Sequence, residues 1–150
     1  MIAGEIPLVA VALLDSPVKR IKHEMQAMQN VELETRHFLA NGMYARVVVR
    51  PADTTIVGLV HKHEHFYIVT KGKVAVTDGM SEAKIYEAGS VIVSQPGTER
   101  VVYAIEDSIC MTVHRTDKTD LAEIEAELVE PDPNSPFTIG NKLKALPCHS

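Results

Sequence analysis

Three histidines fall within five residues, His61, His63 and His65, in the stretch GLVHKHEHFYIVTKG. Imidazole nitrogens are common ligands of divalent transition metals, so this stretch concentrates metal-binding chemistry. Alternate side chains of a strand share one face, and the rise is about 3.3 Å per residue, so the outer two histidines of a regular strand would lie ~13 Å apart. An ion with bonds of about 2.1 Å cannot bridge that distance. The backbone must therefore bend between His61 and His65 if both are to bind one ion.

A bend of this kind makes His61 and His65 the better ligand pair. His63 would lie within the bend, as a third ligand, as a group behind the ligands or as a surface residue. A further neutral donor must come from elsewhere, and His37 and His114 are the available histidines on neighbouring strand patterns. The sequence leaves the choice between these two open.

The elements that must position these residues are mostly short strands with Gly and Pro turns between them. Asn41-Gly42 is a strong hairpin signal. After it, Ala45, Val47 and Val49 share one face, and Arg46, Val48 and Arg50 share the other. The expected strands cover residues 31–39, 43–50, 55–60, 66–70, 73–77, 85–86, 91–94, 100–104 and 109–114. This spacing predicts a mainly β protein, an antiparallel sandwich or small barrel.

Helical patterns flank the strands. Ser16-Pro17 begins a predicted helix over 17–29, and Asp120 with Glu123 matches a capping box for a second helix. Residues 1–14 are expected to form a strand or a packing arm. The prolines after residue 130 predict an irregular arm over 131–150, which is either disordered or docked on a neighbouring subunit. The chain therefore divides into an N-terminal arm and helix (1–30), a β unit (31–116) and a C-terminal helix with its arm (117–150), within one domain.

Composition excludes several partners. The chain has 15 basic and 20 acidic residues, a net charge of −5, which predicts no general nucleic-acid surface. No apolar run reaches the roughly 20 residues that span a bilayer, so no membrane partner is expected. Cys110 and Cys148 have no metal spacing between them and are expected as reduced thiols in a cytoplasmic protein.

Two stretches over roughly residues 43–115 resemble the metal-binding motifs of the cupin superfamily, which fold as a small double-stranded β-helix barrel, or jelly roll. The first motif has a glycine, an HxH pair, a glutamate and a second glycine. Aligned on Gly72, the glutamate position falls on His65, the second histidine position on His61 and the first on Leu59. The resemblance therefore implies a metal site whose usual ligand set is incomplete.

The second cupin motif has the form of a glycine, a PxG turn and a histidine, and here the histidine position falls on Arg100. A guanidinium stays protonated and is a poor metal ligand, but it can hold a carboxylate or phosphate as a bidentate fork. Tyr67, Tyr86 and Tyr103 are expected either to line the same space or to pack in the core. His114, at the end of the last strand, is a further candidate ligand-binding residue.

Three interpretations follow for the histidines. They are ordinary polar residues of a cupin that has lost its metal site, or ligands of a divalent metal such as Zn, Ni or Fe, or, when protonated, partners of Arg100 in binding a small anionic ligand.

The chain is also similar to small cupin-like proteins of tailed phages and prophages, through phrases such as NGMYARVVV, SQPGTERVVYA and EDSICMTVH. This resemblance implies a non-catalytic structural or accessory protein, in the host cytoplasm or the virion, with other phage proteins as partners. Uncovered sheet edges favour a homo-oligomer, a dimer or trimer. The alternative is a metal-binding cupin enzyme that acts on a small polar molecule.

Overall fold

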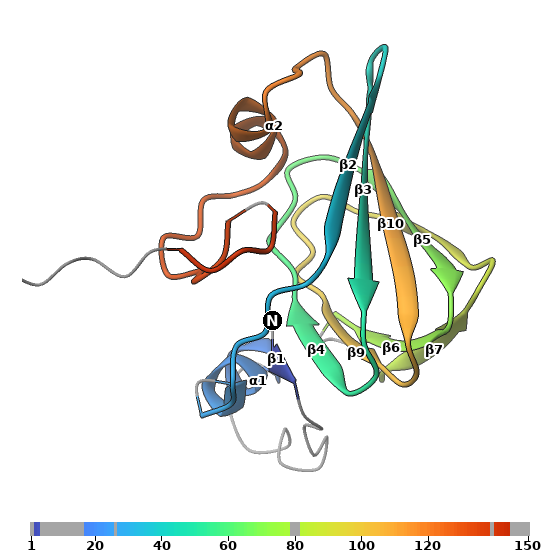
Figure 1. The fold of residues 1–150 in the computed structure, drawn as a ribbon, viewed down its shortest axis with the longest axis vertical. Coiled ribbons are helices and arrows are strands. Elements are labelled where there is room, and N and C mark those ends of the chain that lie inside the picture. The colour runs from blue at the N-terminus through green and yellow to red at the C-terminus, as the bar shows by residue number, and fades with distance from the viewer. Residues whose placement is uncertain (1, 4–16, 26, 79–81, 139, 145–150) are drawn as a thin grey trace, which may run out of the picture.

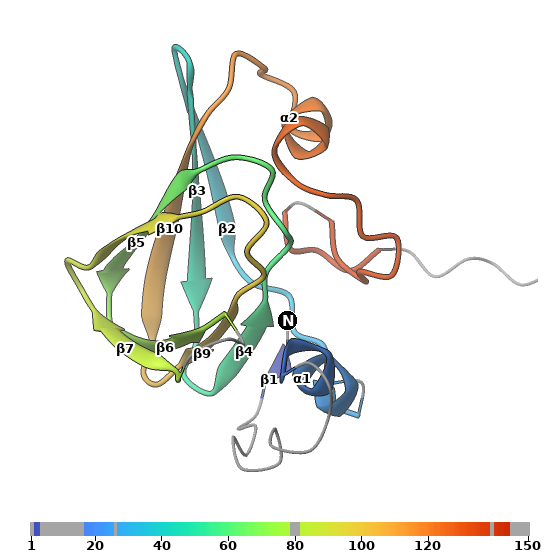
Figure 2. The ribbon, with the colours of Figure 1, turned by 180° about the vertical axis from the view of Figure 1, so that it is seen from behind.

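The structure of the protein, a computed structural model, describes residues 2–3, 17–25, 27–78, 82–138 and 140–144. The described part is mainly antiparallel β with two short helices, as the sequence predicts (Figures 1 and 2). Its elements are β1 (Ile2–Ala3), α1 (Pro17–Met25), β2 (Thr35–Ala40), β3 (Met43–Arg50), β4 (Thr54–Val57), β5 (His65–Lys71), β6 (Lys73–Thr77), β7 (Lys84–Glu87), β8 (Val91–Ser94), β9 (Val101–Ala104), β10 (Ser108–Arg115) and α2 (Leu121–Leu128).

The strands form two five-stranded sheets, in the orders β1-β4-β9-β6-β7 and β2-β3-β10-β5-β8. All pairings between strands are antiparallel within the described residues. From β3 to β6 and again from β7 to β10, successive strands alternate between the two sheets, whereas β2-β3 and β6-β7 are hairpins within one sheet. This arrangement fits a jelly roll of the cupin type. The prediction of a barrel needs correction, because the two sheets are not hydrogen-bonded into a closed cylinder and stand apart on the side of α2 (Figure 1).

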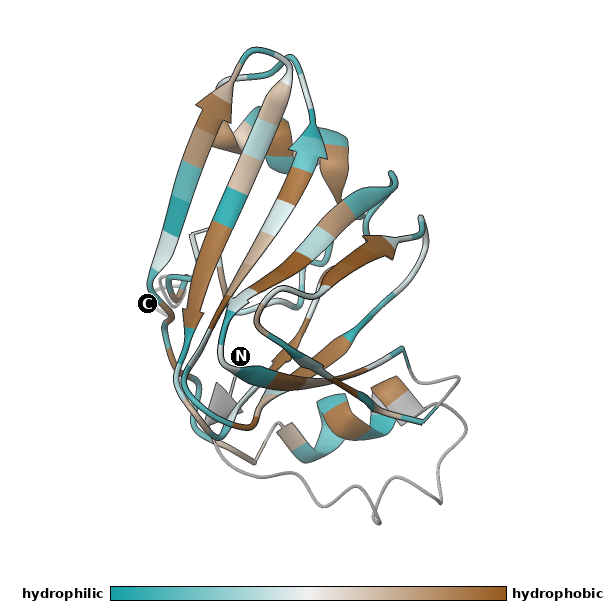
Figure 3. Ribbon diagram, turned by 90° about the vertical axis from the view of Figure 1, so that its right-hand side faces the viewer, coloured by the Kyte–Doolittle hydropathy of each residue, from teal (hydrophilic) through white to brown (hydrophobic). Residues whose placement is uncertain are grey.

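The second sheet has an unusual polarity. On β3 the buried or inward positions include Tyr44, Arg46 and Arg50, whereas Ala45 and Val47 face outward. Hydrophobic and hydrophilic residues alternate in this way along several strands (Figure 3). Part of the interior is therefore polar, and much of the outer face is apolar, which is the reverse of an ordinary two-layer sandwich.

An apolar core fills the end of the interior away from α2. Its buried residues come from both sheets and are Tyr67, Val69, Val74, Val76, Val102 and Cys110. A second apolar cluster joins α1 to β9, because Val18, Ile21 and Met25 of the helix pack on Val101. These clusters fix the strands whose other ends carry the polar residues.

Several boundaries differ from the predicted ones. The strand expected over 31–39 begins only at Thr35, because Leu33 turns inward to pack with Val48 and Ile56. The strand expected over 55–60 is β4, which ends at Val57. The helix expected over 17–29 ends at Met25.

The predicted capping of the second helix is confirmed. The Asp120 carboxylate accepts a hydrogen bond from the Glu123 backbone N–H at 3.1 Å, and α2 then buries Ile124 and Leu128 against Tyr44. The described part of the C-terminal arm packs on its own chain, with Phe137 and Asn141 buried. Residues 4–14 and 145–150 of the predicted arms lie outside the described residues. No described helix is long and apolar enough to cross a membrane.

Candidate metal centre and its cavity

Three imidazoles meet at the open end of the sheets. His61, His65 and His114 each offer a ring nitrogen, and these nitrogens all lie within 4.8 Å of one another. The ring centroids are 4.2 Å apart for His61 and His65, 4.5 Å for His65 and His114, and 5.2 Å for His61 and His114. Among the described residues, this is the group of histidine, cysteine and acidic side chains whose spacing suits a metal ion.

Strand register brings two of the histidines together. Strand β10 pairs with β5, and Thr112 lies opposite Tyr67 in that pairing. His114 and His65 are each two positions along from this pair, on the inward face, so they are neighbours across the two strands. His114 also stacks on the buried ring of Tyr44, whose hydroxyl lies 2.6 Å from His37 Nδ1. Tyr44 therefore supports His114 from behind.

The third histidine reaches the group because the chain bends, as the sequence predicts. After β4 the backbone leaves the sheet, and β5 begins only at His65. Backbone hydrogen bonds hold the bend against the end of α2: the Lys62 N–H donates to the Leu128 carbonyl at 2.8 Å, and the Glu130 N–H donates to the Val60 carbonyl at 2.8 Å. The Gly97 N–H donates to the carbonyl of His61 itself at 2.9 Å. The C-terminal helix and the Gly97 turn therefore position His61.

The remaining histidine candidates lie elsewhere. The side chain of His63 is exposed and is not part of the group of three, but its backbone carbonyl lies 3.1 Å from His65 Nδ1. His63 thus contacts the candidate ligand His65 through its backbone carbonyl, not through its ring. Of the two further donors that the sequence left open, the structure brings His114 into the group and leaves His37 behind Tyr44.

Burial keeps the three imidazoles neutral. Exclusion of water, with a smaller contribution from neighbouring histidines of the group, lowers the pKa of His61 to about 4 and that of His114 to about 3. Burial lowers the pKa of His65 too, and Arg100 adds to that effect. All three rings are therefore unprotonated near pH 7. This state provides lone pairs for a metal and disfavours a protonated histidine as the partner of an anion.

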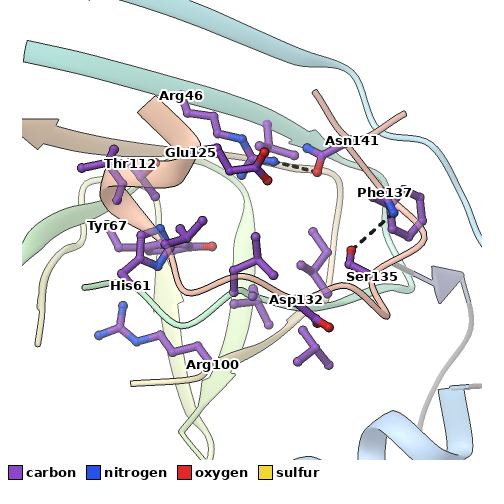
Figure 4. Close-up of a pocket in the computed structure, with 18 of the residues that line it drawn as sticks. Arg46, His61, Tyr67, Arg100, Thr112, Glu125, Asp132, Ser135, Phe137 and Asn141 are labelled. Carbon is purple, nitrogen blue, oxygen red and sulfur yellow. Dashed lines mark hydrogen bonds between the residues drawn. The ribbon is translucent and has the colours of Figure 1, made fainter. Parts of the chain in front are cut away.

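A cavity of about 800 Å³ adjoins the three histidines. Three arginines line it, Arg46 and Arg50 from β3 and Arg100 from the loop before β9. Arg46, His61 and Arg100 approach this space from different elements (Figure 4). The C-terminal segment covers one side, where Asn141 Oδ1 accepts a hydrogen bond from Arg46 Nη2 at 2.6 Å. The chain's own C-terminal segment thus forms one wall of the cavity.

Arg100 and Tyr67 both lie in this cavity, as the sequence analysis expected. The Arg100 guanidinium donates from Nη1 to the buried Ser94 hydroxyl, and its Cζ lies 5.9 Å from the centroid of the Tyr67 ring. Tyr86 packs against the apolar core, and the Tyr103 hydroxyl donates to the Asp53 carboxylate at 2.5 Å. Neither of these two tyrosines lines the cavity of the histidines.

Arg46, Arg50 and Tyr44 were not predicted as functional residues from the sequence. The alternation along 43–50 placed both arginines on one face, and this was the available signal. Because that face also carries valine, while the opposite face is wholly apolar from Ala45 to Val49, the pattern alone does not tell which face is the interior.

Comparisons with known proteins give the fold. No family model and no curated protein matches the chain. A double-stranded β-helix domain protein from Klebsiella pneumoniae is similar with 20% identity and a TM-score of 0.52, over 69% of this chain and 89% of that one. KdgF from Halomonas sp. is similar with 19% identity and a TM-score of 0.51, over 61% and 86%. A cupin-2 domain protein from Shewanella frigidimarina has 14% identity and a TM-score of 0.48, over 73% and 100%.

None of these three names refers to a phage, so the similarity to phage and prophage proteins stays a prediction from the sequence. The chain has a double-stranded β-helix fold, like that of the Klebsiella pneumoniae protein.

Proposed function

We propose that the protein binds one divalent transition-metal ion at His61, His65 and His114, and that this ion contacts a small polar molecule bound in the adjoining cavity. The observation that carries the proposal is the convergence of three neutral imidazoles from separate parts of the chain on one point. Two of them come from the predicted pair, and the third comes from β10, outside both cupin-like motifs. Imidazole ligands suit Zn²⁺, Ni²⁺ and Fe²⁺.

The donor set fits such an ion. Bonds of about 2.1 Å place two ligand nitrogens at most about 4.2 Å apart, so donors within 4.8 Å need only a small inward movement of the rings. A carbonyl only accepts hydrogen bonds, so the His63 carbonyl fixes the proton of His65 on Nδ1 and leaves Nε2 free to bind. The ring of His61 is likewise hydrogen-bonded to the backbone of Leu59.

Three protein ligands leave further coordination positions open, which is the pattern of catalytic rather than structural sites. A metal bound there would supply Lewis acidity to an oxygen of the bound molecule. The chain's own residues would bind and orient that molecule: the arginines by charge, and Tyr67 and Thr112 along the inner face of the sheet. The C-terminal segment excludes bulk water from the side that it covers.

The test is a Co²⁺ or Zn²⁺ titration of untagged, chelator-treated protein by calorimetry. One equivalent should bind, and a His61→Ala, His65→Ala double variant should lose this binding. His63→Ala is the matched control, because its exposed ring lies within the same five residues, and it should bind as the wild type does. Absence of a stoichiometric site in the wild type, or equal loss in the control, would refute the proposal.

A separate observation supports the homo-oligomer that the sequence analysis expected. The outer face of the sheet β2-β3-β10-β5-β8 carries a continuous apolar row across all five strands. Strand register aligns this row as Phe38, Ala45, Val113, Phe66 and Val93. The next row, Val47, Met111, Ile68 and Val91, is also apolar on the four strands β3, β10, β5 and β8, and its one charged member is Arg36 on the edge strand β2.

We propose that a second copy of this chain packs on this apolar face. Phe38 is 53% exposed and Phe66 49% exposed, so large aromatic surfaces lie in solvent in the single chain. Charged residues are depleted, and aromatic residues enriched, at the centres of protein interfaces. A face without charge at its centre can pack on its own copy without opposing like charges.

The mass of the protein in solution, by light scattering after gel filtration, tests this proposal. Phe66→Lys should reduce the mass to that of one chain. Ile85→Lys is the control, because Ile85 is an exposed apolar residue of the other sheet, and it should leave the mass of the assembly unchanged. A wild-type protein that is monomeric at high concentration would contradict the proposal.

A further inference from the structure

Arg50 is buried without the partners that a guanidinium normally requires. It is 6% exposed, and its Nε and Nη1 atoms make no hydrogen bond within the described residues. Arg50 takes part in none of the ion pairs found between described residues, whereas Arg100 has the Asp78 carboxylate as an electrostatic neighbour. A buried charge without a partner costs several kcal/mol of folding free energy, so its presence beside a cavity points to a missing anion.

Two further arginines share this cavity. Arg100 holds a hydroxyl through one of its nitrogens, and Arg46 holds the Asn141 amide oxygen. Burial lowers the pKa of both guanidinium groups, that of Arg46 to about 10, so Arg46 stays protonated at neutral pH. The acidic residues of the lining are Glu125, which acts on Arg46, and Asp132. With neutral histidines, the four cationic side chains of the lining, Lys22 and the three arginines, outnumber its two carboxylates. Outside the lining, Glu99 pairs with Lys22 and Asp78 acts on Arg100, which leaves Arg50 as the buried guanidinium of the lining without an ion pair among the described residues.

The buried ring of Tyr67 brings two of these charges together. The Cζ atoms of Arg50 and Arg100 lie 5.8 Å and 5.9 Å from its centroid, at cation–π distance. Its hydroxyl makes no hydrogen bond of standard geometry and lies beside the Cys110 thiol, a weak partner. The two guanidinium groups are therefore placed around one aromatic surface.

We propose that the cavity binds a small organic anion whose carboxylate or phosphate group is held by Arg50 and Arg100 beside Tyr67. A guanidinium presents parallel N–H donors that match the oxygens of either group. Tyr67 is two positions from His65 on the same face of β5, a step of about 7 Å, so an anion of a few carbons spans from the arginines to the three histidines. The contact at the histidines rests on the proposed metal binding, but the contact at the arginines does not.

The experiment measures anion binding to chelator-treated, full-length protein, so that it is independent of metal. The probes are succinate and inorganic phosphate, with neutral succinamide and sodium chloride at matched ionic strength as controls. Succinate or phosphate should raise the melting temperature, and succinamide and chloride should not. Preference between the two anions identifies the group that the arginines hold. Failure of both anions to stabilise the wild type would overturn the proposal.

Arginine variants locate the binding site. Arg50→Met and Arg100→Met should each weaken the affinity for the stabilising anion about tenfold or more, because a charged hydrogen-bond donor is lost. Arg36→Met is the control, because Arg36 is exposed and pairs with Glu34 on the outside of the sheet, and it should bind the anion as the wild type does. Two folded cavity variants with unchanged anion affinity would overturn the proposal.

The proposals for the metal and the anion fail separately. The His61→Ala, His65→Ala variant should lose metal and keep the stabilisation by the anion. Arg50→Met should lose the rise in melting temperature that the anion causes, and should still bind one equivalent of metal. Metal binding without any anion effect therefore refutes the anion site alone, and the opposite result refutes the metal site alone.

Discussion

The imidazole of His114, on the last strand, stacks on that of His61, in the bend before β5, with ring centroids 5.2 Å apart and planes inclined by 12°. The two residues come from segments whose positions depend on different parts of the fold. His114 is set by the register of β10, and His61 is set by backbone hydrogen bonds to the end of α2. The candidate metal centre therefore depends on α2 as well as on the sheets.

Acidification should destabilise the metal-free protein. The folded-state pKa values of His61, about 4, and His114, about 3, lie below the unfolded value of 6.5, so the unfolded chain binds more protons in acid. The stability that the two neutral histidines contribute is fully present above pH 6.5 and is lost as the pH falls toward their folded-state pKa values. Between pH 7.5 and pH 5 each histidine should lower the free energy of unfolding by about 2 kcal/mol, which corresponds to several degrees of melting temperature.

His114→Gln tests the origin of this pH dependence, because glutamine does not titrate. The melting temperature of the variant should fall less than that of the wild type between the same two pH values, when both are measured by calorimetry after chelator treatment. Equal slopes for the two proteins would show that His114 is not the source.

Arg50→Met should stabilise the protein in the absence of ligands. The substitution replaces an unpartnered buried charge by an apolar side chain of similar length, and such replacements are often favourable by about 1–4 kcal/mol. Urea unfolding of the chelator-treated protein measures the effect. If Arg50 had only a structural role, the substitution would instead destabilise the protein. Arg36→Met is the control, and it should change stability by less than about 0.5 kcal/mol because Arg36 is exposed.

Gly72→Ala should strongly destabilise the turn that follows β5. Gly72 has φ +83°, and a Cβ there would lie 2.3 Å from the Ser108 hydroxyl and 2.4 Å from the Asp107 carbonyl. We expect a loss above about 2 kcal/mol in urea unfolding, since both positive φ and the contact with Asp107 must be relieved. Gly89→Ala separates the two causes, because Gly89 has φ +95° with no atom within 4 Å of the added Cβ. Equal losses in both variants would exclude the steric cause.

The sequence predicted the features that depend on local patterns. The Asn41-Gly42 hairpin, the extent of β3, the cap at Asp120 and the bend between His61 and His65 each follow from neighbouring residues. The choice of His114 over His37 could not be predicted, because it depends on which strands pair and in what register.

The two arginines of the cavity illustrate a second limit. Alternation placed Arg46 and Arg50 on one face of β3, but burial is decided by the opposite sheet and by the segment after α2. Because both faces of β3 carry valines and charged residues ordinarily face solvent, the burial of the two arginines could not be predicted from the alternation. The prediction of element boundaries is limited in the same way. Strand β2 begins only at Thr35, because Leu33 packs in the core against residues from other strands.

Anomalous X-ray diffraction from crystals of the untagged protein grown with Zn²⁺, recorded at the zinc absorption edge, tests the central claim most directly. The account predicts one strong anomalous peak per chain, within bonding distance of ring nitrogens of His61, His65 and His114. A peak at the exposed His63 and Glu64 instead, or no peak among these three histidines, would contradict it.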